Sequence, residues 1–199
     1  MSIALLVIDD GREDYLSRCL ASIGEMCPAL FSRRILIDDS EHELGFAGAI
    51  QAGWDRVLEA QADYVFHVES DFTFNRIVPL ASMVWLLERS KRKLAQVALK
   101  RQPWNPQERE AGGIVEQHPE DFEERPHPVL HTLHRRFFTT NPSLYPREIV
   151  ERGWPQVKHS EGIFTHQLLP EGYHFAFLGG KLDAPWVTHT GKERAGVGY

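Results

Sequence analysis

The chain has 199 residues, of which 42% are hydrophobic and 25% are charged, and these proportions are typical of one soluble globular domain. Its formal net charge of −6 argues against broad electrostatic attraction to nucleic acid or to an anionic membrane, without excluding a local basic groove. Two cysteines, Cys19 and Cys27, are too few for a disulfide framework, so we expect a reduced, cytoplasmic setting. The first apolar run is too short to span a bilayer, and we expect no membrane partner.

The first hundred residues alternate short apolar runs with segments of helical periodicity. Such runs are typical of parallel strands that helices bury on both faces. This alternation predicts right-handed βαβ units and therefore an α/β fold with a parallel sheet. The predicted strands cover residues 3–8, 33–38, 64–68 and 94–100, and the helices between them include one with an inner face of Ile50, Gly53, Trp54, Val57 and Leu58 and one at residues 79–89.

The second half of the chain has a less regular pattern. Its prolines predict a loop at residues 102–109, and its acidic composition predicts a solvated segment at residues 116–125. Residues 189–199 contain three glycines and predict a mobile tail. Further elements are predicted as strands at residues 131–140 and 173–178 and as helices beginning at residue 147 and covering residues 161–169.

Carboxylates follow three of the predicted strands. In a doubly wound sheet the carboxyl ends of the strands converge on one crevice, so these groups should lie close together. Such a cluster needs a cation or hydrogen-bond donors, and hard oxygen ligands suit Mg²⁺ or Mn²⁺. The residues concerned are Asp9, Asp10, Asp38, Asp39, Glu69 and Asp71. An acid-x-acid triplet such as Glu69-Ser70-Asp71 is also common in solvated loops. The sequence before the triplet decides between a metal site and a solvated loop.

The motifs of several other α/β enzymes are absent from the sequence. There is no Gly-x-Gly-x-x-Gly after the first strand, no Gly-x-x-x-x-Gly-Lys-[Ser/Thr] and no Gly-x-Ser-x-Gly. These absences argue against a dinucleotide fold, a P-loop enzyme and a serine hydrolase.

The order of motifs in the first hundred residues resembles a GT-A glycosyltransferase of the family 2 type. The matching segments are the Asp-Gly-Arg turn after the first strand, then ILIDDS, GFAGAIQAGW and YVFHVESDF. The resemblance implies a Rossmann-like, mostly parallel sheet flanked by helices in a single compact domain. It also implies a nucleotide-sugar-binding half at residues 1–101 and an acceptor and catalytic-base half at residues 102–199.

The resemblance implies roles for residues in the first half. The first strand and its turn would hold the nucleotide, the two acids after the second strand would contact base or ribose, and Gly45 lies in the loop that follows. Glu69 and Asp71 would form the metal motif, in which Glu69 replaces the usual first Asp. Whether Glu69 would contact the metal directly or through a water molecule stays open. The donor-binding residues are thus Asp9, Asp10, Gly11, Arg12, Asp38, Asp39, Gly45, Glu69 and Asp71. Because the familiar Asp-Asp-Gly-Ser is Asp-Asp-Ser-Glu here, contacts beyond Asp39 cannot be carried over.

The second half matches the family only at landmarks. Glu161, before a predicted helix, resembles the catalytic base, although an acid there is also common as a helix cap. His189 occupies the place of a late metal ligand, whereas His67 should point away from the site or into the core. Lys192 and Arg194 fit either a solvated terminus or a lid that meets the diphosphate. Aromatic or polar residues for the acceptor side, or for the core, are Trp104, Asn141, Tyr145 and Trp154.

These residues predict a metal-dependent, inverting glycosyltransferase that uses Mn²⁺ or Mg²⁺ and a nucleotide-diphosphate sugar. We favour a UDP-sugar over a GDP-sugar, and the acceptor (a modified DNA base, a protein or a glycan) stays open. In compactness the chain resembles glycosyltransferases carried by some bacteriophages, which would place it in a host cytoplasm. The alternatives are a nucleotidyltransferase, whose Gly-rich basic first loop is missing, and a non-catalytic protein that binds nucleotide sugars.

Overall fold

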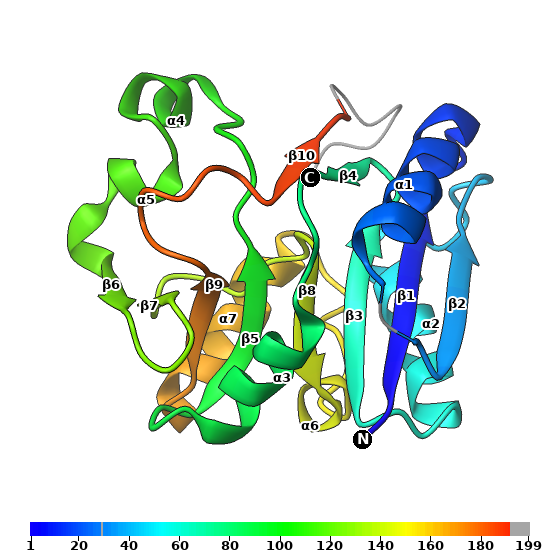
Figure 1. Ribbon diagram of the computed structural model, residues 1–199. Coiled ribbons are helices and arrows are strands. Elements are labelled where there is room, and N and C mark those ends of the chain that lie inside the picture. Colours follow the sequence, from blue (N-terminus) through cyan, green and yellow to red (C-terminus); the bar gives the residue numbers. More distant parts are fainter. Residues whose placement is uncertain (29, 192–199) are drawn as a thin grey trace.

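The computed structural model describes residues 1–28 and 30–191, which form one α/β domain around an eight-stranded sheet (Figure 1). The strand order is β2-β1-β3-β8-β5-β9-β7-β6, and a separate two-stranded ribbon pairs β10 with β4. The strands are β1 (Ile3–Asp9), β2 (Arg33–Asp38), β3 (Tyr64–Glu69), β4 (Phe72–Phe74), β5 (Leu94–Leu99), β6 (Phe122–Arg125), β7 (His131–His134), β8 (Ser143–Pro146), β9 (His174–Leu178) and β10 (Val187–His189). The α-helices are α1 (Glu13–Met26), α2 (Gly45–Glu59), α3 (Leu80–Arg89), α4 (Pro106–Ala111), α5 (Ile114–Gln117), α6 (Arg147–Val150) and α7 (Ser160–Leu168).

The sheet is mixed but mostly parallel. Strands β2, β1 and β3 are parallel, and so are β5 and β9. The short strand β8 lies between the two groups and is antiparallel to both β3 and β5. The predicted βαβ units are therefore confirmed in the first half, whereas β7 and β6 extend the sheet as antiparallel strands beyond β9.

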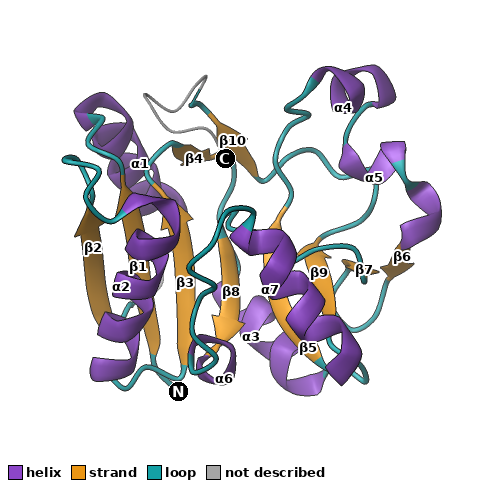
Figure 2. Ribbon diagram, turned by 180° about the vertical axis from the view of Figure 1, so that it is seen from behind, coloured by secondary structure: helices purple, strands orange, loops and turns teal. Residues whose placement is uncertain are grey.

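Helices cover both faces of the sheet. Helices α1 and α3 lie on the face shown in Figure 1, and α2, α6 and α7 lie on the face shown in Figure 2. Because side chains alternate along a strand, β1 sends Leu5 into one core and Leu6 into the other. The α2 contact is especially close, since a Cβ at Gly53 would lie 2.7 Å from a Leu6 methyl group. A Gly at this helix position is thus needed for packing.

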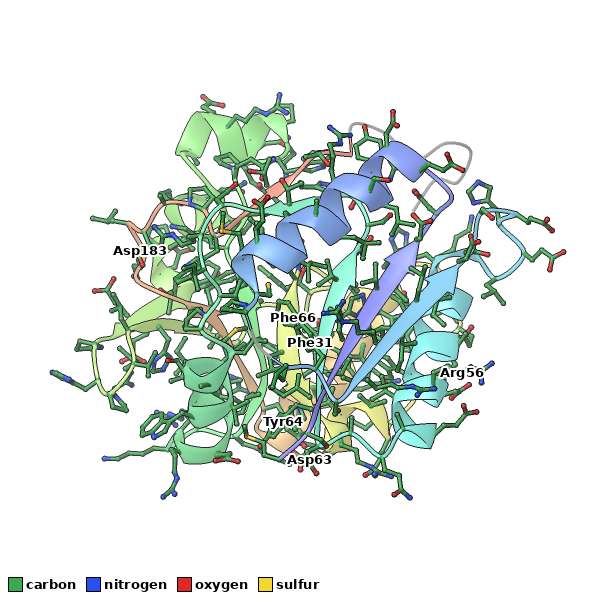
Figure 3. The ribbon with its side chains drawn as sticks, turned by 45° about the vertical axis from the view of Figure 1, so that its right-hand side comes forward. Phe31, Arg56, Asp63, Tyr64, Phe66 and Asp183 are labelled. Carbon is green, nitrogen blue, oxygen red and sulfur yellow. The ribbon has the colours of Figure 1, made fainter. Side chains whose placement is uncertain are left out.

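Several contacts around β1, β3 and α2 can be followed in Figure 3. Phe31 stacks on Phe66 with ring centroids 6.3 Å apart and the planes inclined by 8°. Asp63 lies before β3 and accepts a hydrogen bond of 2.6 Å from the Ser2 backbone. Arg56 projects from α2 into solvent and pairs there with Glu59. The aromatic pair thus fixes the loop before β2 against β3, and the carboxylate fixes the start of β1.

Three predictions for the second half are corrected by the structure. Residues 106–109 of the predicted loop belong to helix α4, because Pro106 is compatible with a first helical turn and Asn105 accepts a 2.8 Å hydrogen bond from the Glu108 backbone. Within the predicted solvated segment, Phe122 is 3% exposed and begins β6. The strand predicted at residues 131–140 ends at His134, since Phe138 leaves the sheet to join the aromatic core. The short helix from Arg147, the helix near Glu161 and the strand near residue 174 are confirmed.

Candidate active site

Acidic side chains meet where β1, β2 and β3 end. Because Asp9 is in register with Asp38, and Ile8 with Glu69, the three strands finish at the same level. Asp9, Glu69 and Asp71 are buried, with 4%, 8% and 4% of their surfaces exposed. The three strand ends thus bring acids to the same edge of the sheet, whereas the single crevice and the roles of the acids stay predictions.

Asp71 is the most heavily engaged of these acids. Its Oδ2 accepts hydrogen bonds from Arg12 Nη2 at 3.0 Å and lies 3.0 Å from His189 Nε2. Burial alone would raise the pKa of Asp71, but the hydrogen bonds and charges of His189 and Arg12 hold this pKa below its ordinary value. The other oxygen, Oδ1, is buried and has no hydrogen-bond partner within residues 1–28 and 30–191. This oxygen can accept a hydrogen bond or bind a cation.

Strand pairing, ring contacts and backbone hydrogen bonds hold His189 in place. Strand β10 pairs with β4 so that His189 is in register with Phe72, and their rings stack at 4.7 Å. The Trp104 ring lies on the imidazole with centroids 3.9 Å apart. The Gln102 side chain accepts from the His189 backbone N–H at 2.9 Å and donates to its carbonyl at 2.8 Å. The first residue of the predicted mobile tail is therefore part of a strand.

Arg12 connects two of the strand-end acids. It forms ion pairs with Asp10 at 2.7 Å and with Asp71 at 3.0 Å. The preceding Gly11 has a φ of +85°, and a Cβ on it would lie 2.5 Å from the Ser40 Cβ, so the turn requires glycine. The Asp-Gly-Arg sequence thus positions a cation over the acid-x-acid triplet.

Two cavities open along this edge of the sheet. The first has a volume of about 630 Å³, and the second about 460 Å³. The first is lined by residues that include Asp9, Asp10, Asp39, Gly45, Phe46, Lys158 and Glu161, and the second by residues that include Glu69, Phe72, Lys100, Trp104, Asn141, Glu161 and His189. Glu161 and Gly162 border both cavities. Glu161 therefore stands at the junction between them.

Glu161 is not the cap of its own helix. Helix α7 begins at Ser160, and Glu161 lies in its first turn. Its Oε1 instead accepts hydrogen bonds from the Thr140 backbone N–H at 2.7 Å and the Thr140 hydroxyl at 3.0 Å. Both donors come from the segment between β7 and β8, so Glu161 ties α7 to that segment and holds its carboxylate between the cavities.

The residues fit a divalent cation. A carboxylate oxygen and an imidazole nitrogen 3.0 Å apart are separated as two ligands of one octahedral ion would be, given ligand distances of about 2.1 Å. The buried Asp71 Oδ1 supplies a further acceptor. Glu69 is less closely placed, since among the described residues it does not form a group with Asp71 and His189 in which all ligand atoms lie within 4.8 Å. Direct and water-mediated contact of Glu69 with a metal ion both stay predictions.

The structure separates the remaining predicted residues. Asp39 lines the first cavity and accepts a 2.9 Å hydrogen bond from the Leu44 backbone, whereas Asp38 is exposed and lies outside both linings. Lys192 and Arg194 lie outside the described residues. His67 is buried and bonds Tyr145 at 2.9 Å, as expected for a core residue. Tyr145 also accepts a hydrogen bond from Trp54, and this places it in the core.

Comparison with solved structures identifies the fold. S. aureus TarS 1-349 in complex with UDP-GlcNAc matches with a TM-score of 0.64 and 14% identity, over 97% of this chain and 59% of that one. The mannosyltransferase PcManGT from Pyrobaculum calidifontis, in complex with GDP-Man and Mn²⁺, matches with a TM-score of 0.61 and 14% identity, over 97% of this chain and 58% of that one. The chain thus has the GT-A glycosyltransferase fold and spans about 60% of the length of these proteins.

Comparison by sequence gives no match. No family model matches the chain, and no curated protein matches it. Within the described residues no helix combines the length and apolar character that a membrane span requires.

Proposed function

We propose that this chain transfers a sugar from a nucleoside-diphosphate donor to an acceptor hydroxyl or amine. The proposal rests on the position of Glu161, which borders both cavities and lies near the Asp71–His189 pair. A donor and an acceptor need separate spaces that meet at one carboxylate, and this arrangement offers them. The GT-A fold shared with TarS and PcManGT supports the same reaction class.

The first cavity is the proposed nucleotide site. Asp9, Asp10 and Asp39 offer hydrogen-bond acceptors for base and ribose, and Phe46 offers an aromatic edge. A UDP-sugar is our favoured donor, and a GDP-sugar is the alternative. Asp71 and His189 would hold a divalent cation, Mn²⁺ or Mg²⁺, which would offset the charge on the departing diphosphate.

The second cavity is the proposed place of sugar transfer. Trp104 and Asn141 line it, and an aromatic ring there suits a sugar face. Glu161 takes the proton from the acceptor while the acceptor atom bonds to the anomeric carbon. The bond from that carbon to the diphosphate breaks on the opposite side, so the configuration inverts. A single base suffices because the diphosphate leaves without needing a proton.

A thermal-shift experiment tests donor binding. Ligand that binds only the native state stabilises it by about 2.7 kcal/mol at a hundredfold excess over Kd. We expect UDP-sugars with Mn²⁺ to raise the melting temperature more than the same donors with EDTA. Asp71→Asn should lose most of the Mn²⁺-dependent part of this shift, because Asp71 lies beside His189. Asp38→Asn, which changes an exposed acid, should keep that part. Equal shifts with Mn²⁺ and with EDTA would contradict metal dependence.

The same donors distinguish catalysis from simple binding. Slow release of UDP from a UDP-sugar without added acceptor is expected of an enzyme, because water then acts as the acceptor. Donor binding without any release, in the presence of Mn²⁺, would favour a non-catalytic protein that binds nucleotide sugars.

A further inference from the structure

A third cavity, of about 520 Å³, lies away from the candidate active site. It is formed by the end of α3, the turn that follows, and the connection from β6 to β7. Figure 1 shows α3 low on the front face and β6 and β7 at one edge, below the upper ends of β1 and β3. We call this cavity the basic groove; it is lined by Trp85, Leu86, Arg89, Ser90, Lys91, Arg92, Arg125, His127, Pro128, His131 and Leu133. None of these residues lines either of the other two cavities described above.

The charge of the basic groove is opposite to that of the chain. Its lining contains four Arg and Lys residues, two His residues and no Asp or Glu, although the whole chain carries a formal net charge of −6. A uniform cluster of cations in an acidic protein costs electrostatic repulsion. Such a cluster favours an anionic ligand.

Three of the cations have no carboxylate partner in the described part of the chain. Arg89, Lys91 and Arg92 form no ion pair there within 4.0 Å, whereas Arg125 pairs with Glu123 at 2.6 Å. A helix C-terminus favours cations, and this accounts for Arg89 in the last turn of α3. It does not account for Lys91 and Arg92, which follow the end of the helix and are exposed.

The floor of the basic groove is apolar and includes an accessible indole. Trp85 is 37% exposed, whereas Leu86 and Leu133 beside it are 1% and 4% exposed. A phosphate alone would need no such surface. An aromatic ring flanked by cations is the arrangement that binds single-stranded nucleic acid, since each base can stack while its phosphate meets Lys or Arg.

We propose that the basic groove binds a short single-stranded segment of nucleic acid, with phosphates against Arg89, Lys91 and Arg92 and a base on Trp85. The hollow shape favours this ligand over a lipid surface, which would meet a projecting apolar face. The proposal does not depend on sugar transfer, because the groove and the candidate active site have no residue in common.

Fluorescence anisotropy with a labelled oligodeoxythymidylate of about 12 nucleotides tests the proposal. The logarithm of the binding constant should fall with the logarithm of salt concentration with a slope of about −2 to −3, since each phosphate contact to a single strand contributes about −0.7. The charge reversal Lys91→Glu/Arg92→Glu should weaken binding by about tenfold or more at low salt. The matched control is Arg33→Glu/Arg34→Glu, which makes the same charge change at exposed positions of β2 and should have much less effect.

The indole has its own test. Trp85→Leu should weaken binding of the oligonucleotide and leave binding of inorganic polyphosphate unchanged, and Trp85→Phe should retain oligonucleotide binding. If the charge-reversed variant has a lowered melting temperature, Lys91→Gln/Arg92→Gln replaces it in the binding measurement. The rise in melting temperature with UDP and Mn²⁺ should be the same in the parent and in all of these variants. Equal weakening by the β2 control, equal binding of polyphosphate and oligonucleotide, or tight binding to phosphatidylglycerol vesicles would each overturn the proposal.

Discussion

His189 Nε2 lies 3.0 Å from Asp71 Oδ2, although 118 residues separate the two along the chain. The contact arises because β10 returns across the edge of the sheet and pairs with β4, the strand that directly follows Asp71. Thr190 strengthens the same junction, since its backbone N–H and its hydroxyl both donate to the Asp71 carbonyl, at 2.7 and 2.8 Å. The proposed metal site therefore depends on the closing of β10 onto β4.

Gly191→Ala should disturb this site by sterics alone. A Cβ at Gly191 would overlap the Asp71 carboxylate, so the side chain of Asp71 must move. We expect the Mn²⁺-dependent part of the melting shift with UDP to fall strongly, while the fold remains. Gly24→Ala is the control, because nothing lies within 4 Å of its Cβ position on α1, and it should stabilise the protein by about 0.5–1 kcal/mol. A Gly191→Ala variant with an unchanged Mn²⁺ response would contradict the proposed metal site.

Gln102→Ala should loosen His189 without touching its imidazole. The Gln102 amide bonds both backbone groups of His189, so its loss leaves the strand end less fixed. Loss of a group that orients a metal ligand typically costs about 10- to 100-fold in metal affinity. Titration of Mn²⁺ by electron paramagnetic resonance measures this directly. Gln167→Ala, at an exposed position on α7, should leave the affinity at the parent value. If Gln102→Ala binds Mn²⁺ with the affinity of the parent, the two hydrogen bonds from Gln102 to the His189 backbone are not needed for metal binding.

The sequence predicts the first half of the fold well for a physical reason. Strands β1, β3 and β5 are largely apolar runs, and helix α2 has a regular inner face of Ile50, Trp54 and Val57. Both patterns are local in the sequence, so they can be recognised without knowing which distant residues the element packs against. The acids at the strand ends follow from the same pattern, because parallel strands end at one edge.

The second half could not be predicted as fully because its elements depend on distant partners. Strand β8 has four residues and ends at Pro146, and only its position between β3 and β5 makes it a central strand. Helix α4 is an exception, because Asn105 and Pro106 at its start are local signals. The hydrogen bonds between the Gln102 side chain and the His189 backbone join residues 87 positions apart, and neither local sequence predicts them.

Two buried histidines predict that stability falls on mild acidification. Burial lowers the pKa of His67 and of His134 to about 3, and the charge of Arg136 adds to the effect on His134. Below the ordinary pKa of about 6.5, the unfolded chain binds protons that the native chain does not. The free energy of unfolding should therefore be fully retained above this pH and should fall below it by about 1.4 kcal/mol per pH unit for each histidine.

Urea unfolding at several pH values between about 7 and 5 measures this slope. His67→Phe keeps a ring in the same space and removes one titrating group, while Tyr145 retains its hydrogen bond from Trp54. The slope of this variant should be smaller than that of the parent by about 1.4 kcal/mol per pH unit below about pH 6.5. An identical slope in the two proteins would mean that His67 does not contribute.

Glu161→Gln should separate catalysis from binding. The amide oxygen of Gln can still accept the hydrogen bonds from Thr140, so α7 and the neighbouring segment should stay in place. The variant has no basic carboxylate, and transfer should therefore fall by about 10²- to 10⁴-fold. The melting shift with UDP and Mn²⁺ should remain, because Asp71 and His189 are untouched. Glu110→Gln, at an exposed position on α4, is the control for loss of one negative charge and should transfer at the parent rate. If Glu161→Gln also transfers sugar at the parent rate, the base lies elsewhere, whereas loss of the shift with UDP and Mn²⁺ would mean that Glu161 supports the donor site instead.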